Sequence, residues 1–102
     1  MSLADGSGAQ DPIARRLLVS GDVQGVGFRA GCRDAALEFG VLGTVRNRSD
    51  GRVEVVGRGS RQDVGRLVDW CRHGPSGAEV NDLDIEELDP ASVTTEDFHV
   101  VH

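Results

Sequence analysis

The sequence is short of cysteine and of aromatic residues, and it has no excess of basic charge. Its 102 residues include two cysteines, three phenylalanines, one tryptophan and no tyrosine, and the formal net charge is −6. Cys32 and Cys71 form no CxxC motif and no disulfide framework, which favours a reducing cytosol and a cytoplasmic location. The acidic balance argues against a nucleic-acid partner. Some open sheets bind RNA through exposed aromatic residues, and this sequence has too few aromatic residues to form that pattern.

Long apolar runs are also missing. No run approaches the roughly 18 residues that span a membrane, and the first dozen residues lack the basic-plus-apolar pattern of a signal peptide. We therefore expect no membrane association. A chain of this length is one domain that buries a core without disulfides. Its beginning is rich in Gly, Ser, Ala and Asp, so we predict a disordered tail over residues 1–13 and one domain over residues 14–102.

The apolar spacing predicts an α+β fold. Alternating apolar residues predict strands at residues 16–23, 41–47, 52–57, 78–88 and 98–101, with an Asp50-Gly51 hairpin between the second and third. Helical stripes predict one helix from Phe28 that Gly40 ends, and a second that Ser60 caps. The order βαββαβ, with one extra short strand, is that of the ferredoxin-like sandwich: an antiparallel sheet with two helices on one face.

Residues 21–29 (Gly-Asp-Val-Gln-Gly-Val-Gly-Phe-Arg) have the clearest chemical pattern. Gly25 and Gly27 allow backbone conformations that place several N–H groups on one concave surface. The helix that follows adds its N-terminus, and Arg29 adds a permanent charge with a planar fork of donors. Together they favour a site for a tetrahedral anion. The expected phosphate-binding residues are Gln24, Gly25, Val26, Gly27, Phe28 and Arg29.

Two other interpretations of the glycines are weighed. Residues 25–30 also fit the dinucleotide fingerprint in its G-x-G-x-x-A form. A dinucleotide fold, however, needs more parallel strands than this chain can supply. The glycines could also form a tight strand-to-helix turn that binds no ligand.

A second motif, residues 43–47 (Gly-Thr-Val-Arg-Asn), is followed by Asp-Gly-Arg-Val-Glu-Val at residues 50–55. With both motifs, the chain resembles the acylphosphatase family over roughly residues 16–101. The resemblance implies a hydrolase that cleaves the carboxyl–phosphate bond of small acyl phosphates to a carboxylate and inorganic phosphate. The family's arginine falls on Arg29 and its asparagine on Asn47. It further implies that Arg29 and the loop amides hold the phosphoryl group, that Asn47 orients the attacking water, and that no metal, cofactor or covalent intermediate is needed.

The chemistry of the residues agrees with that implication. An acyl phosphate already has a good leaving group, so charge stabilisation on the phosphoryl oxygens and an in-line water are what help most. Asn47 has both an acceptor and a donor with which to orient a water. Inorganic phosphate and sulfate offer the same oxygens, and we expect them to inhibit. Thr44 and Gly31 stand where the family usually has aromatic residues, which removes bulk near the wall of the site.

Alternatives remain for these residues. Asn47 could simply begin the hairpin, and the chain could be a non-catalytic module that binds acyl phosphate, carbamoyl phosphate or another anion. Cys32 and Cys71 lie on apolar helix stripes and are expected in the core, where a disulfide between them is conceivable. The three histidines have no ligand-like spacing, so we expect no metal site. We expect a small monomeric enzyme whose acidic residues after position 78 form a solvated strand face that deters edge pairing.

Overall fold

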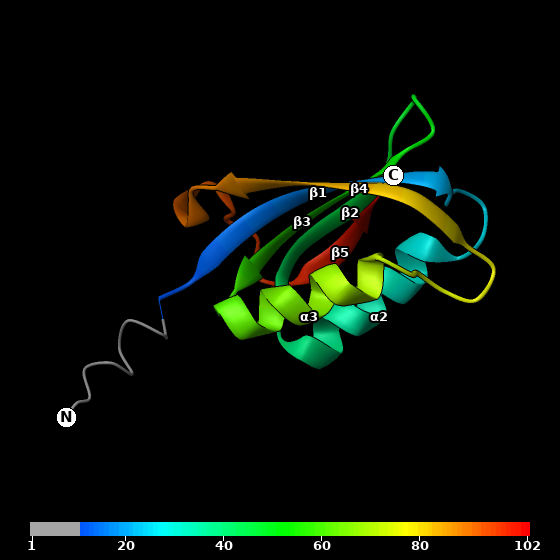
Figure 1. Cartoon of the computed structure of the whole chain (residues 1–102). Coiled ribbons are helices and arrows are strands. Elements are labelled where there is room, and N and C mark those ends of the chain that lie inside the picture. The colour runs from blue at the N-terminus through cyan, green and yellow to red at the C-terminus, as the bar shows by residue number, and fades with distance from the viewer. Residues whose placement is uncertain (1–10) are drawn as a thin grey trace.

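The computed structural model of the chain describes residues 11–102, so the predicted tail at residues 1–13 lies largely outside the described residues. Five strands form one sheet in the order β4-β1-β3-β2-β5. All neighbouring strands are antiparallel except β2 and β5, which are parallel. Both long helices lie on the same face of this sheet (Figure 1), as the ferredoxin-like prediction requires. The elements are β1 (Ile13–Asp22), α2 (Phe28–Phe39), β2 (Leu42–Asn47), β3 (Val53–Gly59), α3 (Arg61–Cys71), β4 (Glu79–Leu88), the short helix η1 (Pro90–Ser92) and β5 (Phe98–Val101).

The core lies between the sheet and the two helices. Alternation along β1 and β3 turns one set of side chains toward the helices, and the apolar stripes of α2 and α3 meet them. Gly40 ends α2 in a left-handed conformation, as predicted. The largest fully buried side chains are Phe28, Leu67, Val19, Val23, Val41, Val45, Val53, Val55, Val64, Cys32 and Cys71. No helix within residues 11–102 is long and apolar enough to cross a membrane.

The first strand differs from its prediction at both ends. It begins at Ile13 rather than at residue 16, because Ile13 pairs with Gly59 of β3 and Ala14 pairs with Leu88 of β4. Near its other end the register with β4 shifts between Ser20 and Gly21. Gly21 has a φ of 130°, and a Cβ there would lie 2.2 Å from the carbonyl oxygen of Glu79. Only glycine fits this bulge, which directs the chain out of the sheet and into the loop before α2.

The hairpin between β2 and β3 forms where the Asp-Gly pair predicts it. The Arg48 N–H donates to the Arg52 carbonyl at 2.8 Å, and Gly51 takes a φ of 93°. The Asp50 carboxylate accepts hydrogen bonds from Arg52 and Arg48. These two cations hold the pKa of Asp50 well below its usual value. The turn is therefore tied together at its tip by the charges of its own residues.

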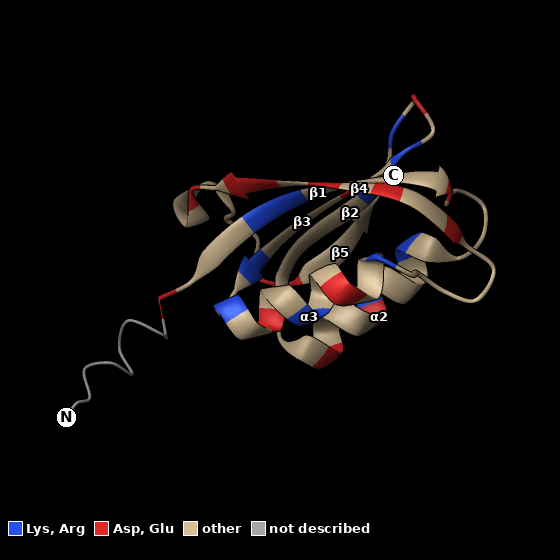
Figure 2. Cartoon of the chain, in the orientation of Figure 1, with Lys and Arg blue, Asp and Glu red and all other residues tan. Residues whose placement is uncertain are grey.

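The β4 edge is acidic and exposed, in agreement with the predicted solvated face (Figure 2). Two of its carboxylates reach back to the neighbouring strand: Glu87 to Arg15 and Glu86 to Arg16, both at 2.6 Å. Ile85, which the alternation places on the apolar side of this strand, is 43% exposed. An edge strand has a neighbour on one side only, so an inward-facing residue there is incompletely covered. The acidic side chains of β4 lie at Glu79, Asp82, Asp84, Glu86 and Glu87, and Asp89 follows as the N-cap of η1.

Candidate active site

The loop between β1 and α2 leads into the N-terminus of α2, whose first N–H groups are not capped by a side chain of the described chain. Gly25 and Gly27 have φ values of 77° and 80°. A Cβ built at either glycine meets nothing within 4 Å, so glycine is required for its conformation and the space beside it is free. Gly27 is the N-cap of α2, and within the described chain this cap has no side-chain hydrogen bond and its first turn has no acidic residue. The first N–H groups of a helix with no such partner suit an anion.

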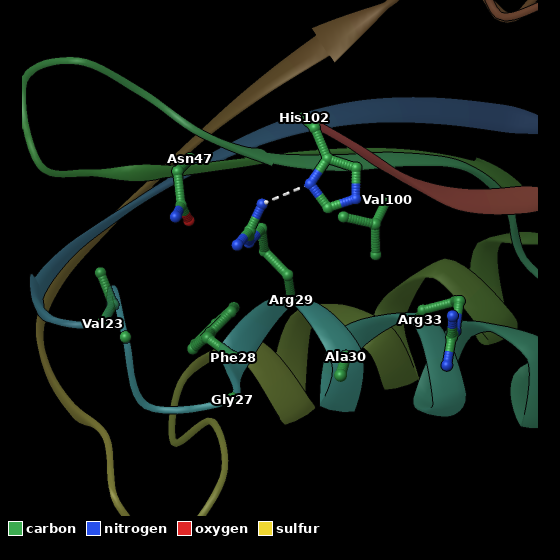
Figure 3. Close-up of a pocket in the computed structure, with 10 residues that line it drawn as sticks. Val23, Gly27, Phe28, Arg29, Ala30, Arg33, Asn47, Val100 and His102 are labelled. Atoms are coloured by element: carbon green, nitrogen blue, oxygen red, sulfur yellow. Dashed lines mark hydrogen bonds between the residues drawn. The ribbon is translucent and has the colours of Figure 1, made fainter.

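Two side chains predicted from the motifs meet at one pocket in front of this loop. Arg29 enters it from the first turn of α2, and Asn47 enters it from the end of β2 (Figure 3). The cavity has a volume of about 310 Å³. The lining residues are Val23, Gly25, Gly27, Phe28, Arg29, Ala30, Arg33, Asn47, Val100 and His102.

The amide oxygen of Asn47 has an unusual environment. Asn47 Oδ1 is buried, and it has no hydrogen-bond partner among residues 11–102. Buried polar atoms are nearly always paired, and leaving an acceptor without a partner costs about 1–3 kcal/mol. Asn47 lines the pocket, so its side chain brings an unused hydrogen-bond acceptor to the edge of the cavity.

The pocket is locally basic in an acidic chain. Arg29, Arg33 and His102 line it, and no Asp or Glu is among the described residues that do. Arg29 Nη1 lies 3.3 Å from His102 Nδ1 (Figure 3). In Figure 2 the acidic residues lie mainly along β4 and on the outer sides of the helices. The arrangement gives a small anion a cationic site despite the net charge of −6.

Of the six loop residues expected to bind phosphate, four line the pocket and two do not. Gly25, Gly27, Phe28 and Arg29 line it. Val26 is partly buried and packs against the hydrophobic core. The side chain of Gln24 extends to the β2–β3 hairpin, where Nε2 donates to the carbonyl oxygens of Arg48 and Arg52.

Arg33 and His102 line the pocket although the motifs do not include them. Arg33 follows Arg29 by four residues, which places both on one face of α2, so helical spacing could have found it. His102 comes into place through the parallel pairing of β2 and β5. The last register pair is Arg46 with Val101, so the next residues along the two strands, Asn47 and His102, lie at the same end. No local pattern encodes that pairing.

The two positions that depart from the family pattern have different surroundings. A Cβ at Gly31 would lie 3.0 Å from the ring of Trp70. That ring also packs edge-to-face on Phe28, with centroids 5.3 Å apart. Aromatic bulk near the loop therefore comes from α3. The prediction that Thr44 borders the site is wrong: because Val45 is buried in the core, Thr44 faces the open side of the sheet and lines a different hollow of about 400 Å³.

The two cysteines are core residues, as predicted. Both are buried free thiols, from α2 and α3. A hydrogen bond with the Cys71 side chain and burial raise the pKa of the Cys32 thiol well above its usual value. Neither lines the pocket. Within residues 11–102, no group of three or more His, Cys, Asp or Glu side chains is arranged to hold a metal ion.

The fold is a ferredoxin-like sandwich, and an uncapped helix N-terminus, Arg29 and Asn47 meet at one small basic pocket. These features define a compact α+β protein with a site suited to a small anion. The sequence model of the acylphosphatase family matches residues 15–100. The chain therefore belongs to the acylphosphatase family, as its motifs predict, and it is a hydrolase.

Individual relatives agree with this assignment. An acylphosphatase of Anaeromyxobacter dehalogenans is 48% identical over 79% of this chain and 87% of its own length. The solved acylphosphatase of Coxiella burnetii has a TM-score of 0.82 and 37% identity, over 89% of this chain and 94% of that one. The Bacillus subtilis acylphosphatase structure has a TM-score of 0.83 and 31% identity, over 88% of this chain and 99% of that one. The likeness thus spans nearly the whole fold.

Proposed function

We propose that the pocket between the 24–29 loop and Asn47 is where this enzyme hydrolyses acyl phosphates. Arg29 and the loop N–H groups hold the phosphoryl group, and Asn47 orients the attacking water. The observation that carries the proposal is the buried Asn47 Oδ1, which has no partner among residues 11–102 and belongs to a side chain that lines the same cavity as Arg29.

The phosphoryl group is bound mainly by charge and geometry. In the transition state the negative charge of the group is spread over its three equatorial oxygens, and preorganised donors aimed at them lower the barrier. The first N–H groups of α2 and the fork of Arg29 supply such donors from two directions. Because these groups provide the positive charge that the phosphoryl oxygens need, the proposed mechanism uses no metal ion or other cofactor.

Asn47 acts on the water. Its Oδ1 accepts a hydrogen bond from the water and so fixes the direction of the oxygen lone pair that attacks phosphorus. The bond from phosphorus to the acyl oxygen breaks as the new P–O bond forms, and the carboxylate leaves with the bonding electrons. An amide is a poor base, so the proton of the water passes to a phosphoryl oxygen. The products are a carboxylate and inorganic phosphate.

Inhibition by simple anions is expected at the same site. Inorganic phosphate and sulfate bind the loop and inhibit competitively, because they offer the oxygens of the phosphoryl group. The enzyme acts as a monomer, which the charged, exposed edge of β4 supports.

It acts in a reducing cytoplasm, which the two free thiols support. The family match at residues 15–100 supports a catalytic domain over residues 14–102, and the pairing of Ile13 with Gly59 extends that domain by one residue.

Replacement of Asn47 tests the proposal. Asn47→Ala removes the group that orients the attacking water and leaves the phosphate site intact. The kcat with benzoyl phosphate should therefore fall about a hundredfold, and the Ki of inorganic phosphate should stay within about twofold of the parent value. Asn81→Ala, at an exposed residue of β4, is the matched control and should keep the parent kcat.

Thermal unfolding must first show that both variants are folded, because Asn47 also borders the hairpin. A folded Asn47→Ala enzyme with the parent kcat would make hairpin formation the role of this residue and would reject the proposal.

A further inference from the structure

We propose that the side chain of Gln24 is a positioning residue: it ties the phosphate loop to the base of the β2–β3 hairpin and so fixes Asn47 relative to the bound phosphoryl group. The inference rests on the proposed function of Asn47. Nothing in the pattern of the loop indicates it, because the motif places Gln24 among residues that offer backbone N–H groups to an anion.

The contact uses both hydrogens of the Gln24 amide nitrogen. Gln24 Nε2 lies 2.9 Å from the carbonyl oxygen of Arg48 and 3.0 Å from that of Arg52. One –NH₂ group thus donates to both sides of the hairpin. The Arg52 oxygen also accepts from the Arg48 N–H at 2.8 Å, so the Gln24 contact and the first hydrogen bond of the turn share an acceptor.

This contact joins parts of the molecule that the sheet does not join directly. β1, which leads into the loop, and β2, which ends with Asn47, are separated in the sheet by β3. Asn47 opposite Val53 is the last register pair of β2 and β3. Beyond that pair the hairpin extends away from the sheet (Figure 1). Gln24 contacts the chain at Arg48, the residue directly after Asn47.

The consequence for catalysis is a separation of two roles within one loop. The backbone of the loop faces the anion, and the Gln24 side chain sets where the water-orienting amide lies relative to that anion. Attack on phosphorus depends steeply on alignment, and a displacement of about 1 Å can cost a hundredfold in rate. Loss of the contact should therefore lower kcat while leaving phosphate binding largely intact.

A double-mutant cycle tests the inference. Gln24→Met keeps the length of the side chain and removes both hydrogen bonds, so kcat with benzoyl phosphate should fall roughly tenfold and the Ki of inorganic phosphate should change by less than about twofold. In the Asn47→Ala background the same substitution should lower kcat by less than about twofold, because the residue that it positions is gone. Gln62→Met, at an exposed residue in the first turn of α3, is the matched control and should keep the parent kcat.

Two results would overturn the inference. One is an equal loss of kcat from Gln24→Met in both backgrounds. The other is a rise of the phosphate Ki in step with the fall in kcat, since either result would make the contact a general support of the loop. If Gln24→Met does not fold, Gln24→Asn, which keeps the amide on a shorter side chain, should show the same split between kcat and Ki. If Asn47→Ala itself keeps the parent kcat, the proposed function fails first and this inference falls with it.

Discussion

The two long helices lie on the same face of one sheet, yet their N-termini are built in opposite ways. The N-cap of α3 is Ser60 in an extended conformation, and its hydroxyl oxygen accepts a hydrogen bond from the Asp63 N–H at 3.0 Å. The N-cap of α2 is Gly27 in a left-handed conformation, with no side-chain cap among the described residues. Asp63 stands three residues after its N-cap, whereas the same position of α2 is Ala30.

The difference shows how a fold separates stability from ligand binding. A Ser cap is worth about 1 kcal/mol relative to Ala, and an acidic residue in the first turn adds a few tenths more. The sequence uses both devices on α3 and neither on α2. The N–H groups of α2 are then left to whatever enters the basic pocket, which under the proposed function is the phosphoryl group.

The largest effect is expected when the positive charge of Arg29, beside the uncapped N-terminus of α2, is removed. Arg29→Ala should lower kcat with benzoyl phosphate by about 10²–10³-fold and should also weaken inorganic phosphate binding, because under the proposed function Arg29 contacts the phosphoryl group in the ground and transition states. Arg29→Lys should restore only part of the activity, since an ammonium lacks the planar fork. Arg61→Ala, in the first turn of α3, is the matched control and should keep the parent kcat. Full turnover in folded Arg29→Ala would place the active site on another surface.

An intermediate effect is expected when the first turn of α2 receives an acidic residue like the one in the first turn of α3. Ala30→Asp puts a carboxylate at the position that Asp63 has in α3, at the edge of the pocket. Its charge competes with the anion for the helix N-terminus, so the Ki of inorganic phosphate should rise roughly tenfold. Ala30→Asn, which has nearly the same shape without the charge, should change the Ki much less. Equal effects of the two variants in isothermal titration would show that shape, and not charge, governs the open end.

The smallest effect is expected at the closed end. Ser60→Ala removes the N-cap of α3 and should lower the free energy of unfolding by about 1 kcal/mol, measured by urea denaturation. Ser60→Thr, which retains a hydroxyl cap, should recover most of that loss. Neither variant should change kcat, because Ser60 does not line the pocket. A marked fall in kcat for Ser60→Ala would show that the two helix ends are energetically coupled.

Local signals predicted much of the fold and two of the residues that line the candidate site. The limits of α2 follow from the apolar stripe and Gly40, and the start of α3 follows from Ser60, because caps and periodicity are encoded within a few residues. Arg29 and Asn47 were found through motifs whose residues are close in sequence. His102 was not found in this way. Its place depends on the pairing of β5 with β2, and His102 and Asn47 are separated in sequence by more than half the chain.

The directions of some side chains were also not predicted from the sequence. Gln24 belongs to the loop, but its amide extends to a hairpin more than twenty residues away. No periodicity in a loop predicts such a contact. Thr44 is a different case: strand alternation with the apolar Val45 would have placed it on the open face of the sheet. The error came from treating a departure from the family pattern as if it lay at the pocket.

The packing of Trp70 gives the molecule a built-in optical reporter. It is the one tryptophan of the sequence, and the sequence contains no tyrosine. Intrinsic fluorescence excited at the red edge of the indole band therefore comes from a single ring. That ring lies against Gly31 and Phe28, in the first turns of the helix that opens on the pocket. Without any label, its emission should follow both the docking of α2 on α3 during folding and the small readjustments of the loop when an anion arrives.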